Sequence, residues 1–153
     1  MIEKFKKNFR SFGDLWLFIR IFGLITLLPI IVKYLSIPTL LKTLTPGDKK
    51  FGKSLNVDSL IEKMVKYTDY ILGYNWLVYK KTCLTRSLVL YHFLRKYGIE
   101  VHICLGVKKG ESLGEVDSEK ILQGHAWLTY DGNIFLEKNP IGTHTFKTTF
   151  SFP

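Results

Sequence analysis

The chain predicts an α+β domain in which helices precede an antiparallel sheet. Residues 83–97 place apolar side chains nearly all round a helix, which is typical of a central, buried helix. The apolar residues of "IEVHICLGV" then alternate, and an Asp131-Gly132 pair separates "GHAWLTY" from "NIFLEKN", which predicts three strands. With 153 residues and 46% hydrophobic composition, the chain is long enough to bury a core, and wholesale disorder is excluded.

The first expected element is an apolar helix over residues 15–32, interrupted by Arg20 and Pro29. No small-residue cleavage site follows it, so a secretory signal does not fit. Three alternatives remain open: a buried apolar helix, a helix attached to a membrane surface, and a spanning helix. Nearby basic and aromatic residues favour the second: Lys4, Phe5, Lys6, Lys7, Phe9, Arg10, Phe12 and Trp16.

Charge is distributed unevenly along the chain. Residues 1–53 hold 10 basic and 3 acidic groups, which is +7 of the total +9. The turn-rich stretch "SIPTLLKTLTPGDKKFGKSLNVD" follows the apolar run and predicts short helical pieces joined by turns. We therefore expect an apolar, basic helical segment over residues 1–55 and a core over residues 56–153.

Two further helices are expected before the strands. Asp58 is placed to N-cap the first, whose apolar stripe ends before Gly73. The loop "YNWLVYKKT" follows, and the central helix then begins at Cys83, with Thr82 as its N-cap and Gly98 at its end.

Two cysteines without a Cys-x-x-Cys pair predict no disulfide framework, and we expect a reducing, cytoplasmic location. We expect no metal or other cofactor, because the cysteines and histidines lack the short spacings of zinc ligands. We also expect no nucleic-acid binding, because no known module pattern occurs. The histidines are His92, His102, His125 and His144.

Cys83 and His125 are candidates for nucleophilic catalysis. Cys83 follows Lys80 and Lys81 at a predicted helix start, where the free amides and the positive end of the helix dipole favour a thiolate. His125 is expected on a strand beside Trp127, where it can serve as the base. The bland interpretation is a small buried cysteine and a packed histidine. Cys104, in an apolar alternating run, is expected to be an inert core residue.

A third group has to orient the base. A two-residue turn would place His125 opposite Lys138 and turn Glu137 to the other face. A three-residue loop, Asp131 to Asn133, would place Glu137 on the face of His125 and Asn139 directly across from it. We predict the three-residue loop, since Gly132 and Asn133 tolerate the left-handed conformation.

These residues carry a resemblance to a known family. "TCLTRSLVLYHFLRKYGIEVHICLGVKKG" followed by "GHAWLTYDGNIFLEKNP" resembles the transglutaminase-like peptidases that remove the leader from lasso-peptide precursors. The likeness is to the form in which the peptidase is separate from the leader-recognition domain. The shared features are a Cys-Leu pair opening a helix, an Arg three residues later, a Leu-Gly-Val strand and a His-Ala-Trp with an acid twelve residues after the His.

The resemblance implies a papain-like cysteine peptidase core in which Cys83 is the nucleophile, His125 the base and Glu137 the acid. The family usually has Asp where this chain has Glu137, and an acid where it has Thr129, so Asp131 and Asn139 remain substitutes. The resemblance covers residues 80–140. It also implies the partners: a precursor leader peptide, a separate leader-recognition protein and a macrolactam-forming cyclase.

The expected function is therefore a cysteine peptidase that cleaves a small ribosomally made precursor. The Cys83 amide would be one oxyanion donor, and Asn75 is a speculative second. Two alternatives stay open. One is a non-catalytic basic module that binds a membrane surface or an acidic partner. The other is an acyl transferase that uses the same triad, as transglutaminases do.

Overall fold

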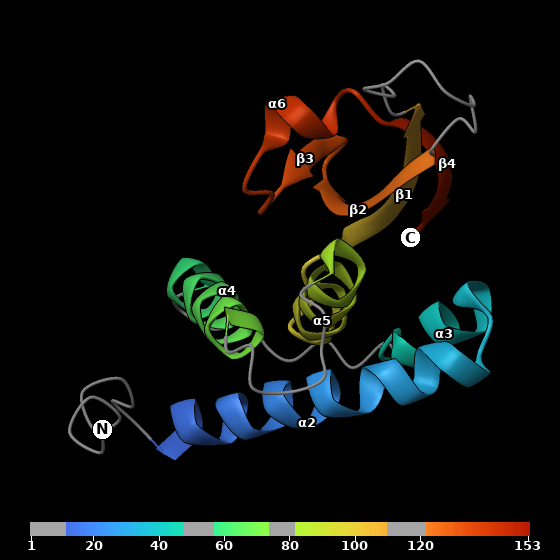
Figure 1. The fold of residues 1–153 in the computed structure, drawn as a ribbon. Coiled ribbons are helices and arrows are strands. Elements are labelled where there is room, and N and C mark those ends of the chain that lie inside the picture. Colours follow the sequence, from blue (N-terminus) through green and yellow to red (C-terminus); the bar gives the residue numbers. More distant parts are fainter. Residues whose placement is uncertain (1–11, 48–56, 74–81, 110–121) are drawn as a thin grey trace.

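A computed structural model describes residues 12–47, 57–73, 82–109 and 122–153. The central helix and the two strands of the expected hairpin are all present. The elements are α2 (Phe12–Tyr34), α3 (Ile37–Leu44), α4 (Val57–Gly73), α5 (Cys83–Lys96), β1 (Val101–Lys109), β2 (Leu122–Tyr130), β3 (Asn133–Phe135), α6 (Pro140–Thr143) and β4 (Lys147–Phe152). In the described chain, α2, α3 and α4 precede the central helix, β1 lies between it and the hairpin, and α6 and a further strand follow the hairpin (Figure 1).

The described elements form three layers (Figure 1). The antiparallel sheet has the order β3-β2-β1-β4. α5 packs on β1 and β2, with α4 beside it, and α2 crosses both helices on the side away from the sheet. This is the predicted α+β architecture, with α5 in the middle.

The ends of α5 follow from its sequence. The Thr82 side chain accepts a hydrogen bond from the Thr85 amide at 3.1 Å, so the helix begins at Cys83 as predicted. Gly98 has a φ of 81°, and the amides of Gly98 and Ile99 donate to the carbonyls of Arg95 and Leu94. This is a Schellman motif, in which glycine supplies the left-handed residue.

One hydrophobic core joins all the layers. Ile21 and Ile25 of α2 and Leu41 of α3 are buried in the same cluster as Leu88 of α5 and Ile103 of β1. The N-terminal helices α2 and α3 thus belong to the same core as α5 and the sheet. The proposed boundary between residues 55 and 56 stays a prediction, and it lies outside the described residues.

Three details differ from the sequence expectations. A fourth strand, β4, pairs with β1, and its exposed outer positions leave only a weak alternating signal. The strand expected over "NIFLEKN" ends at Phe135. α4 begins at Val57, so Asp58 lies inside its first turn and is not the N-cap, although its charge there still suits the helix dipole.

α2 is buried along one face only, so it contributes to the core and also exposes an apolar side. Leu17, Ile21, Ile25 and Leu28 face the core, whereas Trp16 and Ile30 are exposed. In the described part of the chain, α2 alone is long and apolar enough to cross a membrane. A core helix of a soluble protein or a signal sequence would meet the same criteria.

Candidate active site

Cys83 is the first residue of α5 and is partly exposed. At this position the helix leaves its first amides without partners within the helix, and the macrodipole is positive. Because Thr82 already bonds the Thr85 amide, the amides of Cys83 and Leu84 are the ones the helix leaves for another acceptor. The start of α5 therefore places the Cys83 side chain beside amides that have no partner within the helix.

Cys83 and His125 line the same cavity, which has a volume of about 340 Å³. Among the hydrogen bonds of the described residues, none joins the Cys83 sulfur to the imidazole, as is common when no substrate is bound. Residues of α3, α5 and the sheet line this open cavity. The other lining residues are Ile37, Leu84, Leu105, Gly106, Val107, Gly124, Ala126 and Thr149.

Two aromatic rings, those of Trp127 and Phe146, pack against the imidazole of His125. Trp127 stacks on it with centroids 5.9 Å apart and planes at 19°, as the strand alternation predicted, and Phe146 lies 5.0 Å away. Gly106 is paired with His125 across β1 and β2. A Cβ at Gly106 would lie 2.7 Å from the Trp127 ring, so only glycine leaves room for this indole.

Two oxygens approach the Nε2 atom of His125. Glu137 Oε2 and Thr143 Oγ1 each lie 3.4 Å from it. The Thr143 hydroxyl donates its proton to the Asn139 carbonyl at 2.9 Å, so its oxygen can only accept from the ring. Both oxygens thus favour a proton on Nε2. Nδ1 is then the nitrogen with a lone pair for a thiol proton.

Glu137 reaches His125 although the predicted loop is wrong. The hairpin turn has two residues, Asp131 at a φ of 48° and Gly132 at 75°, and Tyr130 pairs with Asn133. Such a turn matches the twist of the strands. Pairing then ends at Phe135, and Leu136 has a φ of 55°, so strand alternation does not continue to Glu137.

An ionic cluster contacts the residues on both sides of Glu137, at the Leu136 carbonyl and at the Lys138 side chain. Arg86 of α5 donates to the Leu136 carbonyl at 2.8 Å and to Asp69 of α4 at 2.8 Å. Lys138 lies 3.0 Å from the second Asp69 oxygen. We call Arg86, Asp69 and Lys138 the clamp. It ties the residues before and after Glu137 to the helix that carries Cys83.

Arg86 and Asp69 are largely shielded from water, with 12% and 22% of their side chains exposed, whereas 54% of the Lys138 side chain is exposed. Burial raises the pKa of Asp69, but the hydrogen bonds and charges of Arg86 and Lys138 outweigh it and hold that pKa below its ordinary value. Asp69 therefore stays ionised, as a bridge between two cations requires.

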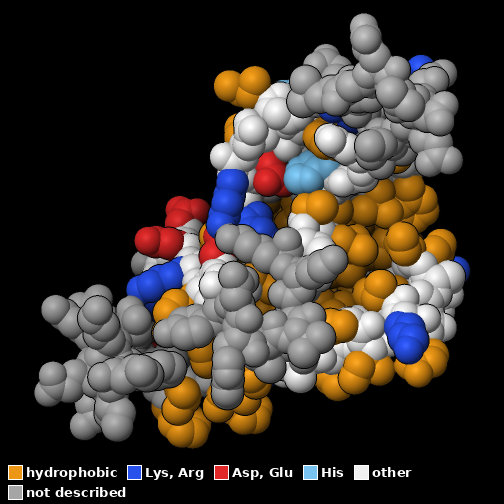
Figure 2. Space-filling model, viewed as in Figure 1, with side chains coloured by type: hydrophobic (Ala, Val, Ile, Leu, Met, Phe, Trp, Pro, Cys, Tyr) orange, Lys and Arg blue, Asp and Glu red, His pale blue; other side chains and the backbone are white. Residues whose placement is uncertain are grey.

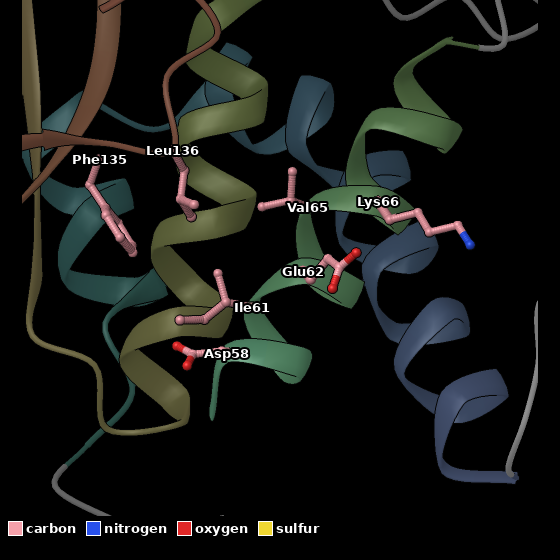
Figure 3. A pocket seen from close by; sticks show the side chains of 7 residues that line it. All are labelled: Asp58, Ile61, Glu62, Val65, Lys66, Phe135 and Leu136. Carbon is pink, nitrogen blue, oxygen red and sulfur yellow. The ribbon is translucent and has the colours of Figure 1, made fainter. Parts of the chain in front are cut away.

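The side chain of Leu136 reinforces this anchor. It points toward Ile61 and Val65 of α4, beside Phe135, and lines a surface cavity of about 500 Å³ (Figure 3). The left-handed backbone of Leu136 costs of the order of 1 kcal/mol, which its apolar contacts and the Arg86 bond offset. The turn that presents Glu137 is thus fixed by side chain and backbone together.

The other candidates for the third group lie elsewhere. Asp131 is exposed at the hairpin tip. Asn139 caps α6, where its side chain accepts from the Gly142 amide at 2.9 Å.

Two other residues from the sequence predictions lie away from the triad. Cys104 is buried on β1, where it contacts Thr129, and its chemical inertness stays a prediction. Asn75 lies outside the described residues.

Within the described ranges, no cluster of His, Cys, Asp or Glu that could hold a metal ion occurs. The roles of Thr143, Asp69 and Lys138 could not be predicted from the sequence, because each depends on a tertiary contact. The position of Arg86, three residues after Cys83, marked it as a shared feature of the family, but its partners could not be predicted from the sequence. Gly106 could have been noticed, since a glycine inside a strand suggests a close approach.

A comparison with known protein families shows the superfamily of the chain. The family model of the transglutaminase-like superfamily matches residues 26–151, which includes α5, β1, β2, β3, all of β4 but its last residue, and the positions of Cys83, His125 and Glu137. Neither a curated protein nor a solved structure matches the chain significantly. Members of the matching superfamily are typically cysteine peptidases or acyl transferases. The chain belongs to the transglutaminase-like superfamily.

Proposed function

We propose that this protein is a cysteine peptidase with the catalytic residues Cys83, His125 and Glu137. One observation carries the proposal: Cys83 at the start of α5 and His125 line one cavity, and Glu137 lies 3.4 Å from the far ring nitrogen. A structural role alone would not require these three groups to converge.

In this mechanism, Nδ1 of His125 takes the Cys83 proton and the sulfur attacks the substrate carbonyl. The amide of Cys83 is placed to donate to the oxyanion. The imidazolium protonates the leaving amine, which leaves a thioester on Cys83. Water then gives a proton to His125 and attacks the thioester, releasing the acid and restoring the thiol.

Glu137 and Thr143 act on the base in this scheme. The Thr143 oxygen accepts from Nε2, which keeps the lone pair on Nδ1, and the Glu137 carboxylate, 3.4 Å from Nε2, stabilises the positive ring after proton transfer. Trp127 and Phe146 shield the ring and fix its plane.

The proposed substrate is the leader portion of a lasso-peptide precursor. The sequence resemblance over residues 80–140 supports this substrate, and the match to the superfamily is compatible with it. We further propose a cytoplasmic location, a separate leader-recognition protein that delivers the precursor, and a cyclase that uses the freed N-terminus. The cavity needs no bound cofactor for this reaction.

The test combines the full chain with a candidate precursor and a candidate leader-recognition protein, and detects products by mass spectrometry. Two hydrolysis fragments are expected from the wild type and from Cys104→Ala, and none from Cys83→Ala. Cleavage that survives in Cys83→Ala would contradict the proposal.

An acyl transferase is the second candidate, because the same thioester can pass to an amine. An isopeptide-linked product in place of two fragments would select it. The non-catalytic module would give neither product, and vesicle or partner binding would remain in Cys83→Ala. The convergence of Cys83, His125 and Glu137 favours catalysis over this module.

A further inference from the structure

α2 exposes a continuous apolar face on the side opposite the core. Charged residues are absent from this face between Phe12 and Ile30, because Asp14 is buried and Arg20 lies half-buried near Lys96. Hydrophobic side chains line the lower edge of the molecule over α2 (Figure 2). The residues of this α2 face are Phe12, Leu15, Trp16, Ile19, Phe22, Leu27 and Ile30.

The α2 face also offers few polar groups to a partner. Thr26 lies on it, but its hydroxyl donates to the Phe22 carbonyl at 2.8 Å. Protein interfaces usually carry about one hydrogen bond per 100–200 Å². Exposed apolar patches of this extent on a soluble monomer mark a surface that something covers.

We propose that the α2 face inserts into the surface of a lipid bilayer, with the helix axis parallel to the membrane plane. Helices that bind in this way immerse their apolar side at the boundary between headgroups and acyl chains. Trp16 is suited to this boundary, because its indole combines a large apolar ring with one donor.

A spanning orientation would break the fold. The opposite side of α2 fills the core with Ile21 and Ile25, and Asp14 pairs with Lys63 of α4 at 2.8 Å. Crossing the bilayer would strip these contacts from the core and place an acid in hydrocarbon. The helix therefore lies on the membrane while it stays packed on α4 and α5.

Charge favours an anionic lipid surface over a second copy of the chain. Residues 1–53 carry a net charge of +7, and the one acid of α2 is buried. Two copies that met through this segment would repel each other, whereas anionic headgroups attract each basic group. An acidic partner protein would share the attraction but would find few hydrogen-bonding groups on the α2 face.

Membrane binding would also set the place of the cavity. α2 leads through Leu35 and Ser36 into α3, and Ile37 of α3 lines the cavity with Cys83 and His125. The binding itself does not depend on the proposed chemistry.

The experiment is vesicle flotation of the full chain with phosphatidylcholine alone and with added phosphatidylglycerol. We expect the wild type to float with both, more tightly with the anionic vesicles, and we expect salt to remove that difference. The double variant Ile19→Glu/Ile30→Glu should bind at least about tenfold more weakly. Ile141→Glu, at a position 83% exposed on α6, is the matched control and should bind as the wild type does.

A second measurement uses brominated lipids, which quench a tryptophan that enters the bilayer. Quenching should be present in the wild type and absent in Trp16→Phe, which keeps the apolar surface. Three outcomes would overturn the proposal. The first is no flotation with either vesicle, and the second is a wild-type dimer that does not form in the Ile19→Glu/Ile30→Glu variant. The third is a protein that stays in the membrane at alkaline pH, as one with a spanning helix does.

Discussion

Arg86 donates a hydrogen bond of 2.8 Å to the Leu136 carbonyl, one residue before Glu137. Arg86 lies one helical turn after Cys83 on α5. The same helix therefore carries the proposed nucleophile and holds the backbone beside the acid. Any movement of α5 relative to this segment would separate the two ends of the proposed triad.

Arg86→Lys tests this link. A lysine ammonium cannot present the planar fork that bonds Asp69 and the Leu136 carbonyl together. We expect a loss of about 1–3 kcal/mol in the free energy of unfolding and a lower alkylation rate of Cys83. Lys138→Met is the control, because the Lys138 side chain is 54% exposed and its ion pair contributes at most about 1 kcal/mol. Unchanged Cys83 reactivity in Arg86→Lys would contradict the link.

Gly106→Ala tests the support of the base. The added methyl would meet the Trp127 ring at 2.7 Å and the Lys147 carbonyl at 2.8 Å. We expect a destabilisation of about 1–3 kcal/mol and an altered near-ultraviolet circular dichroism signal from the displaced indole. Gly124→Ala is the matched control: it also lines the cavity, but its Cβ would meet nothing within 4 Å. Equal effects of the two variants would contradict the packing argument.

Thr143→Val tests the assigned tautomer. It removes an acceptor for the Nε2 proton while it keeps the buried shape of Thr143. We expect the ¹⁵N spectrum of His125 to show a larger share of the Nδ1-protonated form, and Cys83 to react several-fold more slowly. Thr143→Ser retains the hydroxyl and should restore both signals. A wild-type spectrum dominated by the Nδ1-protonated form would rule out this assignment.

His92 gives the fold a dependence on pH. Its Nδ1 atom lies 2.7 Å from the Leu44 carbonyl, which can only accept, so Nδ1 carries the proton. Burial lowers the pKa of His92 below its ordinary value of 6.5, the bond to Leu44 opposes this shift, and Lys96 and Arg20 add to it. The neutral ring is therefore favoured in the folded state.

The sign of the effect follows from this lowered pKa. As pH falls below 6.5 the unfolded chain binds a proton first, so the stability from His92 is complete above 6.5 and declines toward the folded-state pKa. Urea unfolding at about pH 7.5 and about pH 5.5 should show a smaller loss in His92→Gln than in the wild type. His102→Gln, at an exposed position, is the control and should follow the wild type. A wild-type stability that rises on acidification would contradict this account.

Local sequence patterns predicted much of the fold and the position of Cys83 at the start of α5. Thr82 and Gly98 act within one turn of the chain, so capping rules place both ends of α5. The strand beside Trp127 follows from alternation, which depends only on which side is buried. These features need no knowledge of distant contacts.

The position of Glu137 could not be predicted in this way. Alternation places Glu137 only if strand pairing continues, but Leu136 leaves the strand with a positive φ, and contacts from α4 and α5 hold it there. The turn type was also misjudged, because both Asp131 and Gly132 adopt left-handed conformations. Tertiary contacts here override the local period.

The alkylation of Cys83 tests the central claim most directly, because it needs no substrate. The rates at Cys83 and Cys104 would be read peptide by peptide by mass spectrometry at about pH 6, where a free thiol is almost wholly protonated. Wild type, His125→Ala and Glu137→Gln would be compared, alone and with a candidate leader-recognition protein. The account predicts fast modification of Cys83 in the wild type, a loss of it in His125→Ala, an intermediate rate in Glu137→Gln and little modification of the buried Cys104. A Cys83 that reacts no faster than a free thiol, or at the same rate without His125, with and without that protein, would contradict it.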